Sequence, residues 1–229
     1  MTFTGHGPAM DLPAGASIGA DGVWSQVLDR PEGAPRRAGL FLDRDGAIVE
    51  EVDYLHRPGD VRLIPGAAQV IAQANRLGVP VVIVTNQSGI ARGLYGWDEF
   101  IAVEKKVDDE LAAAGAFVNG VFACPHHRQG SPPHDHPDHP ARKPNPGMLL
   151  AAADRLGLDL AVSWIVGDRA TDLLAGKNAG LAGGVHVLTG HGADQGERET
   201  ALALAEDGFR VSGGRAMADA LTMLPLLKG

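Results

Sequence analysis

The 229-residue chain contains a single cysteine, Cys124, and this scarcity limits the sites that it can build. One cysteine forms no disulfide within the chain and provides no all-cysteine metal site. A disulfide framework and a four-cysteine zinc site are therefore both excluded. The first 37 residues also lack the basic segment and apolar segment of a signal peptide, so we expect a cytoplasmic protein.

Long apolar runs and an excess of positive charge are missing as well. No apolar run reaches about 18 residues, so we expect no membrane-spanning helix. Lys and Arg number 20 against 28 Asp and Glu, which gives a formal net charge of −8. Nucleic acids and anionic membranes bind basic surfaces, so this balance argues against either as a general partner. An acidic protein can still contain a local basic pocket that binds a small anionic metabolite. We expect a monomer.

From Ala38 onward, short apolar runs alternate with longer amphipathic segments. The runs are rich in Val and Ile, as in strands buried on both faces of a parallel sheet, and they cover residues 39–43, 79–85, 118–123, 162–167 and 184–188. Between them, apolar residues recur at helical spacing in 100–111 and 148–156. This alternation predicts a three-layer, doubly wound, Rossmann-like α/β domain with a mainly parallel sheet. A strand at 209–211 and a helix from about 216 to 227 would complete it.

Two segments do not follow this alternation. Residues 1–37 are rich in Gly, Ala and Pro, and we assign them to an N-terminal arm that precedes a domain over 38–229. The weakly apolar patch at 23–28 predicts that the arm either packs on the domain surface or is partly disordered. Residues 125–146 are dominated by His, Pro and Asp and predict a long ordered loop or a disordered insertion within the domain.

Polar residues follow three of the predicted strands. Asp43 and Asp45 come after the first, Thr85 and Asn86 end the second, and Asp168 follows the fourth. Ligands of open parallel sheets bind outside the carboxyl ends of the strands, so we expect these side chains to converge. Neighbouring aspartates repel one another unless a cation lies between them, and carboxylate oxygens suit Mg²⁺. The pattern therefore predicts a magnesium site.

The same region offers groups that bind a phosphate. Thr85 and Asn86 supply hydrogen-bond donors, while Arg142 and Lys143 supply positive charge. Carboxylates, a divalent cation, a hydroxyl donor and a lysine are the parts that phosphoryl transfer through an aspartyl-phosphate requires. The residues thus predict a locally basic phosphate pocket inside an acidic protein.

Four ordered motifs resemble those of the haloacid dehalogenase (HAD) superfamily. They are DRDG at 43–46, VTNQSG at 84–89, RKP at 142–144 and GDRATD at 167–172, and the resemblance runs from about Ala38 to Gly190. It implies the HAD fold and a metal-dependent phosphatase, a phosphoric monoester hydrolase. Four motifs in order are a strong signal, whereas DRDG alone is a weak one.

The resemblance also implies a role for each matching residue. Asp43 would be the nucleophile that takes the phosphoryl group, and Asp45 would protonate the leaving alcohol and then activate water. Thr85 would hydrogen-bond the phosphoryl oxygens, and Lys143 would offset the charge on Asp43. Asp168 would bind Mg²⁺ together with Asp43 and the backbone carbonyl of Asp45.

Two longer segments narrow the resemblance within the superfamily. TNQSGIARG at 85–93 and CPHH at 124–127 are similar to the bacterial D-glycero-D-manno-heptose-1,7-bisphosphate 7-phosphatases, which lack a large cap domain. This implies removal of the 7-phosphate from that bisphosphate, with Asn86, Arg92 and Arg142 binding the substrate. The alternative is histidinol phosphate or another small phosphate monoester, because the histidinol-phosphate phosphatases share the architecture and the fourth motif.

Five of the nine histidines lie in the loop, at 126, 127, 134, 136 and 139. The resembled phosphatases carry a zinc-bound loop that reads Cys-x-His and then Cys-x-Cys before the RKP motif. Here Cys124 and His126 match the first pair, but His139 and Ala141 stand where the later cysteines would be. We expect a mixed structural zinc site of Cys124, His126, His136 and His139. The alternative is a solvated His/Pro loop without metal.

Two other classes of function compete with a phosphatase. A non-catalytic module that binds a phosphate ligand would keep the fold without turnover, and a phosphotransferase or mutase would need a cap or an acceptor site. The presence of Asp43 and Asp45 argues against the first, and the short segments between motifs argue against the second. Among other polar residues, we expect Arg44 to pair with a carboxylate away from the pocket, and His56 and His191 to be surface or core residues.

Overall fold

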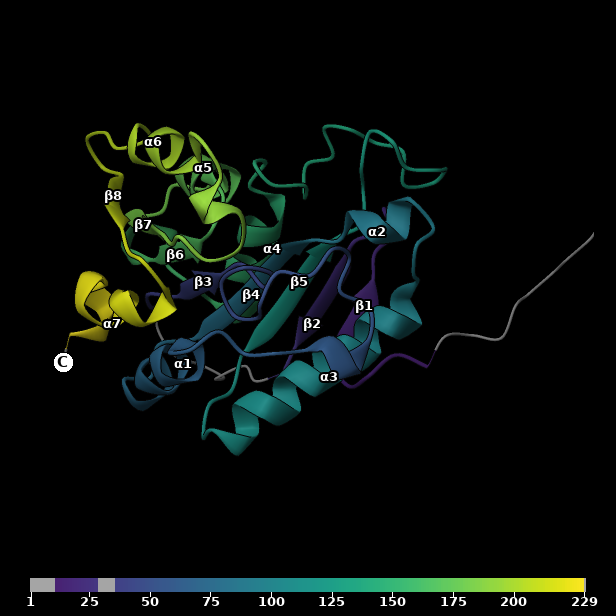
Figure 1. The fold of residues 1–229 in the computed structure, drawn as a ribbon, viewed down its shortest axis with the longest axis horizontal. Helices are drawn as coiled ribbons and strands as arrows, with labels where there is room; N and C mark the ends of the chain where they lie inside the picture. Colours follow the sequence, from purple (N-terminus) through teal and green to yellow (C-terminus); the bar gives the residue numbers. More distant parts are fainter. Residues whose placement is uncertain (1–10, 29–35, 229) are drawn as a thin grey trace, which may run out of the picture.

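In a computed structural model that describes residues 11–28 and 36–228, one eight-stranded sheet forms the centre of the fold (Figure 1). Its strand order is β1-β2-β5-β4-β3-β6-β7-β8. The strands are β1 (Ala16–Ile18), β2 (Trp24–Val27), β3 (Leu40–Leu42), β4 (Val81–Asn86), β5 (Gly120–Cys124), β6 (Trp164–Gly167), β7 (Gly183–His186) and β8 (Arg210–Gly213). All pairings among β3 to β8 are parallel, which confirms the predicted sheet.

Seven α-helices accompany the sheet in the described part of the chain. They are α1 (Ala67–Arg76), α2 (Ser88–Ala91), α3 (Trp97–Ala113), α4 (Gly147–Leu156), α5 (Ala170–Asn178), α6 (Glu197–Leu202) and α7 (Ala220–Met223). Within residues 36–228, the segments that join the strands hold no further element except short 3-10 turns, so none of them contains a large cap. None of the helices within the described ranges is both long and apolar enough to cross a membrane.

Alternate side chains of the strands enter two separate cores, because successive residues of a strand point to opposite faces. Leu40 and Leu42 of β3 pack in one core with apolar residues of α1 and α3. Phe41, between them, packs in the other core with residues of α4 and α5. Figure 1 shows α1 and α3 on one side of the sheet and α5 and α6 on the other. The result is the predicted three-layer architecture.

The described part of the N-terminal arm belongs to the sheet, which differs from both alternatives that the sequence suggested. Strands β1 and β2 form an antiparallel hairpin, and β2 pairs antiparallel with β5. Trp24 is fully buried and stacks on Trp97 of α3 at 5.5 Å between ring centroids, with the Phe100 ring at 5.4 Å. Residues 1–10 and 29–35 of the arm lie outside the described residues.

The C-terminal tail is less regular than the predicted helix over 216–227. A 3-10 turn at Met217–Asp219 precedes α7, and a second one follows at Pro225–Leu227. Pro225 has no backbone N–H to donate and does not fit a helix interior, so α7 ends before it. The tail still covers one core, because Met217, Ala220 and Leu224 are buried against it.

The hairpin's place in the sheet leads to a stability prediction. Replacing Trp24 by Ala would leave a cavity between β2 and α3 and should lower the free energy of unfolding by about 3–5 kcal/mol. Phe117→Ala is the matched control, because the Phe117 side chain is 50% exposed and should cost less than about 1 kcal/mol. Urea denaturation followed by circular dichroism measures both; equal losses would show that Trp24 is not a core residue.

Candidate active site

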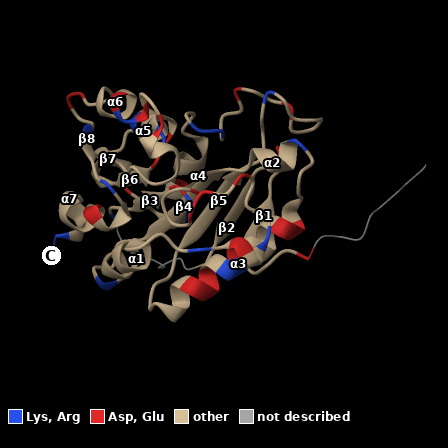
Figure 2. Ribbon diagram, viewed as in Figure 1, with Lys and Arg blue, Asp and Glu red and all other residues tan. Residues whose placement is uncertain are grey.

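A cavity of about 440 Å³ opens at the carboxyl ends of β3 and β4. Figure 2 shows acidic residues gathered near these strand ends and others spread along α3. The structure brings most of the sequence-predicted site residues to this cavity. Its lining includes Asp43, Asp45, Thr85, Asn86, Arg92, Arg142 and Lys143.

Lys143 is the central positive charge of the cavity. Its Nζ lies 2.7 Å from Asp43 Oδ1 and 2.8 Å from Asp172 Oδ1, and it donates to the Val84 carbonyl at 2.8 Å. Burial lowers the pKa of Lys143, but the carboxylates of Asp172 and Asp43 outweigh burial and raise this pKa above its usual range. Lys143 therefore stays protonated next to Asp43.

Three buried carboxylates lie close together beside this lysine. Oxygen atoms of Asp43, Asp168 and Asp172 are all within 4.8 Å of one another. Asp168 Oδ2 accepts a hydrogen bond from the His191 N–H at 2.7 Å, whereas Asp168 Oδ1 is buried without a partner among the described residues. Burial and the neighbouring Asp172 raise the pKa of Asp168 to about 7. Burial also raises the pKa of Asp43, although Lys143 opposes it.

The backbone around Asp168 leaves room only for glycine. Gly46 and Gly190 have φ values of 86° and 55°, and a Cβ at either position would lie 2.3 Å from Asp168 Oδ2. The two glycines therefore let the backbone approach the carboxylate closely. Oxygen donors, a deficit of positive charge and an unpartnered carboxylate oxygen together fit a hard divalent cation such as Mg²⁺. Asp43 and Asp168 would hold it, and Asp172 lies within reach of the same position.

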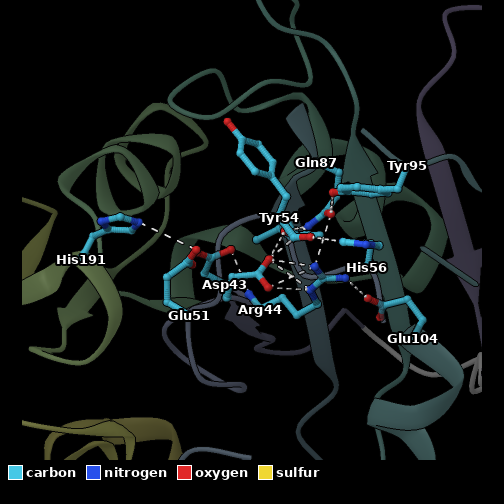
Figure 3. A network of polar contacts seen from close by, with 12 residues as sticks. Asp43, Arg44, Glu51, Tyr54, His56, Gln87, Tyr95, Glu104 and His191 are labelled. Carbon is cyan, nitrogen blue, oxygen red and sulfur yellow. Dashed lines mark hydrogen bonds and ion pairs between the residues drawn. The ribbon is translucent and has the colours of Figure 1, made fainter. Parts of the chain in front are cut away.

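Asp45 lies at the same strand end but contacts different partners, of which Figure 3 labels Arg44 and Gln87. Arg44 donates to it from Nε at 3.1 Å and from Nη2 at 3.0 Å, and Gln87 Nε2 donates to Oδ2 at 3.1 Å. The predicted pairing of Arg44 with a carboxylate is present, with Asp45 and Glu104 of α3 as partners. Its predicted place away from the pocket is wrong, because Arg44 and Asp45 both line the cavity. The Asp45 side chain is 19% exposed and faces the cavity from this network.

Thr85 and Asn86, at the end of β4, have different surroundings. Thr85 Oγ1 accepts a hydrogen bond from Gln87 Nε2 at 2.8 Å and lies 3.4 Å from Asp45 Oδ2. The Asn86 amide donates to the Lys143 carbonyl at 3.1 Å and accepts from the Lys143 N–H at 3.0 Å. In this structure Asn86 therefore holds the backbone of Lys143 in place.

Two arginines lie at the rim of the cavity. Arg92 Nη1 donates to the Tyr54 hydroxyl at 2.6 Å, and its Nη2 donates to Gln129 Oε1 at 2.9 Å. Arg142 Nη1 donates to the His126 carbonyl at 2.8 Å. Neither guanidinium is paired with a carboxylate within the described residues, so both leave positive charge for an anionic substrate.

Three histidines of the loop over 125–146 lie close to the imidazole ring of a fourth, His126. The imidazoles of His126 and His139 stack with centroids 3.9 Å apart, and the rings of His134 and His136 lie 5.3 and 6.1 Å from His126. His126 Nε2 lies 2.7 Å from the backbone oxygen of Asp21, in the hairpin between β1 and β2. His126 Nδ1 is buried without a partner among the described residues.

These histidines do not form a ready chelate with Cys124. Among the described residues, the three-aspartate group is the only set of three donors that lie within 4.8 Å of one another. Cys124 is buried in the core on the α4 side, and burial raises the pKa of its thiol to about 12. Ala141, which carries no ligand atom, packs in the same core. The loop thus provides imidazoles close together but no preformed four-ligand site.

Several residues around the cavity were not predicted from the sequence. Glu51, Tyr54 and His191 line it, although His191 was expected to be a surface or core residue. His191 lies beyond the carboxyl end of β7, and the rule that located Asp168 could have found it. Glu104 could not be found this way, because it lies inside the apolar pattern of α3 and far from any motif.

Comparisons with known proteins agree with this geometry. A family model described as HAD-hydrolase-like matches residues 140–207. The D-glycero-β-D-manno-heptose-1,7-bisphosphate 7-phosphatase of Mesorhizobium japonicum is 52% identical over 163 residues, which cover 71% of this chain and 75% of that protein. The Pasteurella multocida phosphatase of the same name is 40% identical over 151 residues, 66% of this chain and 82% of that protein.

Solved structures give the same picture. A HAD-like phosphatase from Mesorhizobium loti superposes with a TM-score of 0.79 at 43% identity, covering 90% of this chain and 93% of that one. The D,D-heptose 1,7-bisphosphate phosphatase from B. bronchiseptica, complexed with magnesium and phosphate, superposes with a TM-score of 0.67 at 36% identity. The superposition covers 81% of this chain and 97% of the B. bronchiseptica chain.

Proposed function

We propose that this chain, which belongs to the HAD-like phosphatase family of the D-glycero-β-D-manno-heptose-1,7-bisphosphate 7-phosphatases, removes the 7-phosphate of that bisphosphate. The observation that carries the proposal is the ion pair of Lys143 with Asp43 beside the three-carboxylate group. This arrangement places a candidate nucleophile (Asp43), a fixed ammonium group (Lys143) and a candidate Mg²⁺ site at one strand end.

We propose the following roles for the residues. Asp43 Oδ attacks the phosphorus and forms an aspartyl-phosphate, while the bond to the leaving alcohol breaks. Asp45 gives its proton to the alcohol oxygen and then takes a proton from the water that cleaves the aspartyl-phosphate, which releases inorganic phosphate and restores Asp43. Lys143 and Thr85 hold the phosphoryl oxygens. A Mg²⁺ ion held by Asp43, Asp168 and the Asp45 carbonyl, when bound, neutralises phosphoryl charge.

The rim supports a substrate with a second phosphate. Arg92 and Arg142 face the cavity without carboxylate partners among the described residues, and guanidinium groups bind phosphates through two parallel hydrogen bonds. Arg92 sits on a short helix after β4, where its contacts with Tyr54 and Gln129 hold it at the opening. Histidinol phosphate carries an ammonium group, which these cations would repel.

A second proposal concerns the histidine loop, which we propose holds a structural Zn²⁺ through Cys124, His126, His136 and His139. The close imidazole rings and the unpartnered, buried His126 Nδ1 support it. Binding would require rotation of the rings and loss of the Cys124 proton, because the donors are not within chelating distance and a ligating thiol is deprotonated.

Loss of the nucleophile tests the reaction itself. Asp43→Asn should lower kcat by roughly 10³-fold or more, because the amide cannot form the covalent intermediate. Asp109→Asn on the exposed face of α3 is the control and should leave kcat unchanged. Release of inorganic phosphate from the heptose bisphosphate measures both. Unchanged turnover by the Asp43 variant would contradict its role as nucleophile, and a wild-type protein without turnover would favour the non-catalytic binding module.

Loss of Arg92 tests the second phosphate. Arg92→Ala should raise KM for the heptose bisphosphate by about tenfold, since a hydrogen-bonded ion pair contributes about 1.5–3 kcal/mol. KM for the same sugar with only its 7-phosphate should change much less. Arg76→Ala, on the exposed surface of α1, is the control. Equal kcat/KM of the wild-type enzyme for the bisphosphate and for histidinol phosphate would contradict the substrate assignment.

Metal analysis tests the zinc loop. Protein purified without chelators should contain zinc in amounts close to the protein concentration, and Cys124→Ser and His139→Ala should each lose it and unfold at a lower temperature. His56→Ala, outside the loop, should keep the metal. Inductively coupled plasma mass spectrometry gives the metal content. A zinc-free wild-type protein would establish the solvated loop instead.

A further inference from the structure

Asp45 accepts hydrogen bonds from a largely buried polar network, and the roles proposed above do not account for that network. The Arg44 side chain is 1% exposed and pairs with two carboxylates: Asp45, which lines the cavity, and Glu104 of α3. Figure 3 shows Arg44 beside Glu104. Arg44 Nη1 donates to Glu104 Oε1 at 2.7 Å. The guanidinium also lies 5.6 Å from the centre of the Phe100 ring, so its charge is enclosed by protein.

Gln87 joins this network from the end of β4. Its Nε2 donates to Asp45 and to Thr85, and its Oε1 accepts from the Tyr95 hydroxyl at 2.5 Å. The amide orientation of Gln87 is thus fixed by Tyr95, and Gln87 in turn holds Asp45 from a second direction. Two of the three side chains in direct contact with Asp45 are therefore themselves held: Arg44 by Glu104, which does not line the cavity, and Gln87 by Tyr95.

Glu104 has no direct route to a substrate. It is buried within α3, does not line the cavity, and its Oε2 has no hydrogen-bond partner among the described residues. Burying a carboxylate with one oxygen left without a partner is costly, so its presence in an apolar helix face calls for a role that offsets the cost. The only described cation within ion-pair distance of Glu104 is Arg44.

We propose that Glu104 is a positioning residue for Asp45, acting through Arg44. With Glu104 ionised, the charge of Arg44 is shared between two carboxylates, so its hold on Asp45 orients the carboxyl group without trapping it. Without Glu104, Asp45 is the only anion within reach of a buried guanidinium, and the two form a closed ion pair. Asp45 then fails to turn toward the leaving oxygen with its proton.

The inference rests on the proposed phosphatase reaction, and it predicts how the effect of losing Glu104 depends on the leaving group. Only a leaving group that departs as a strong base needs the proton of Asp45 during cleavage. A sugar alkoxide is such a group, whereas nitrophenolate leaves without protonation. A defect in positioning Asp45 should therefore depend on the leaving group, whereas general damage to the fold or to the Mg²⁺ site should lower both reactions alike.

The experiment compares Glu104→Gln with the wild-type enzyme on the heptose bisphosphate and on p-nitrophenyl phosphate. We use kcat/KM, which reports the first irreversible step, the transfer of the phosphoryl group to Asp43. The ratio of kcat/KM for the sugar phosphate to that for the aryl phosphate should fall by about tenfold, part of the roughly 10²–10⁴-fold that a general acid contributes. Glu104→Asp, which keeps the carboxylate, should recover part of the ratio.

Two further variants complete the test. Glu110→Gln, six residues along α3 and paired with exposed Lys106, should leave the ratio as in the wild type. Tyr95→Phe removes only the hydroxyl that orients Gln87, and it should also lower the ratio. This variant provides the test if Glu104→Gln does not fold. Equal losses on both substrates, or an unchanged ratio, would overturn the positioning role. A wild-type enzyme that hydrolyses neither substrate would instead overturn the proposed function.

Discussion

The contact of Lys143 with Asp43 and Asp172 is the interaction on which the active site depends. Three carboxylates within 4.8 Å of one another are unfavourable in a buried cavity, and the ammonium group of Lys143 is the described cation that touches two of them. One positive charge against three carboxylates leaves a net negative site. A divalent cation held by Asp43 and Asp168 would offset this deficit and would supply positive charge for a phosphate.

The position of Lys143 is in turn set by backbone contacts. Asn86 makes two hydrogen bonds with the Lys143 backbone, and Lys143 Nζ donates to the carbonyl of Val84. The lysine therefore ties the end of the histidine loop to β4, and its two ion pairs extend the connection to β3 and α5. These contacts fix the end of a 22-residue loop without helix or strand, so that it can hold Lys143, the proposed catalytic lysine, in one position.

Sequence reasoning predicted the features that follow from short-range rules. Parallel strands place their carboxyl ends at one edge, so Asp43, Thr85 and Asp168 could be brought together without a structure. The β1–β2 hairpin could not, since its pairing with β5 joins segments about a hundred residues apart and the burial of Trp24 depends on that pairing. Glu104 was missed for the opposite reason, because the apolar period of α3 predicts packing and says nothing about a buried charge.

Charge is divided in space in a way that reconciles an acidic protein with an anionic substrate. The carboxylates nearest the chemistry are mostly buried, and Lys143 and Arg44 offset part of their charge. Arg92 and Arg142 lie at the rim, where the proposed function places the second phosphate of the substrate. The net charge of −8 therefore describes the outer surface rather than the path of the substrate. In the proposed function, a few placed cations, rather than the overall charge, would determine which anion the cavity accepts.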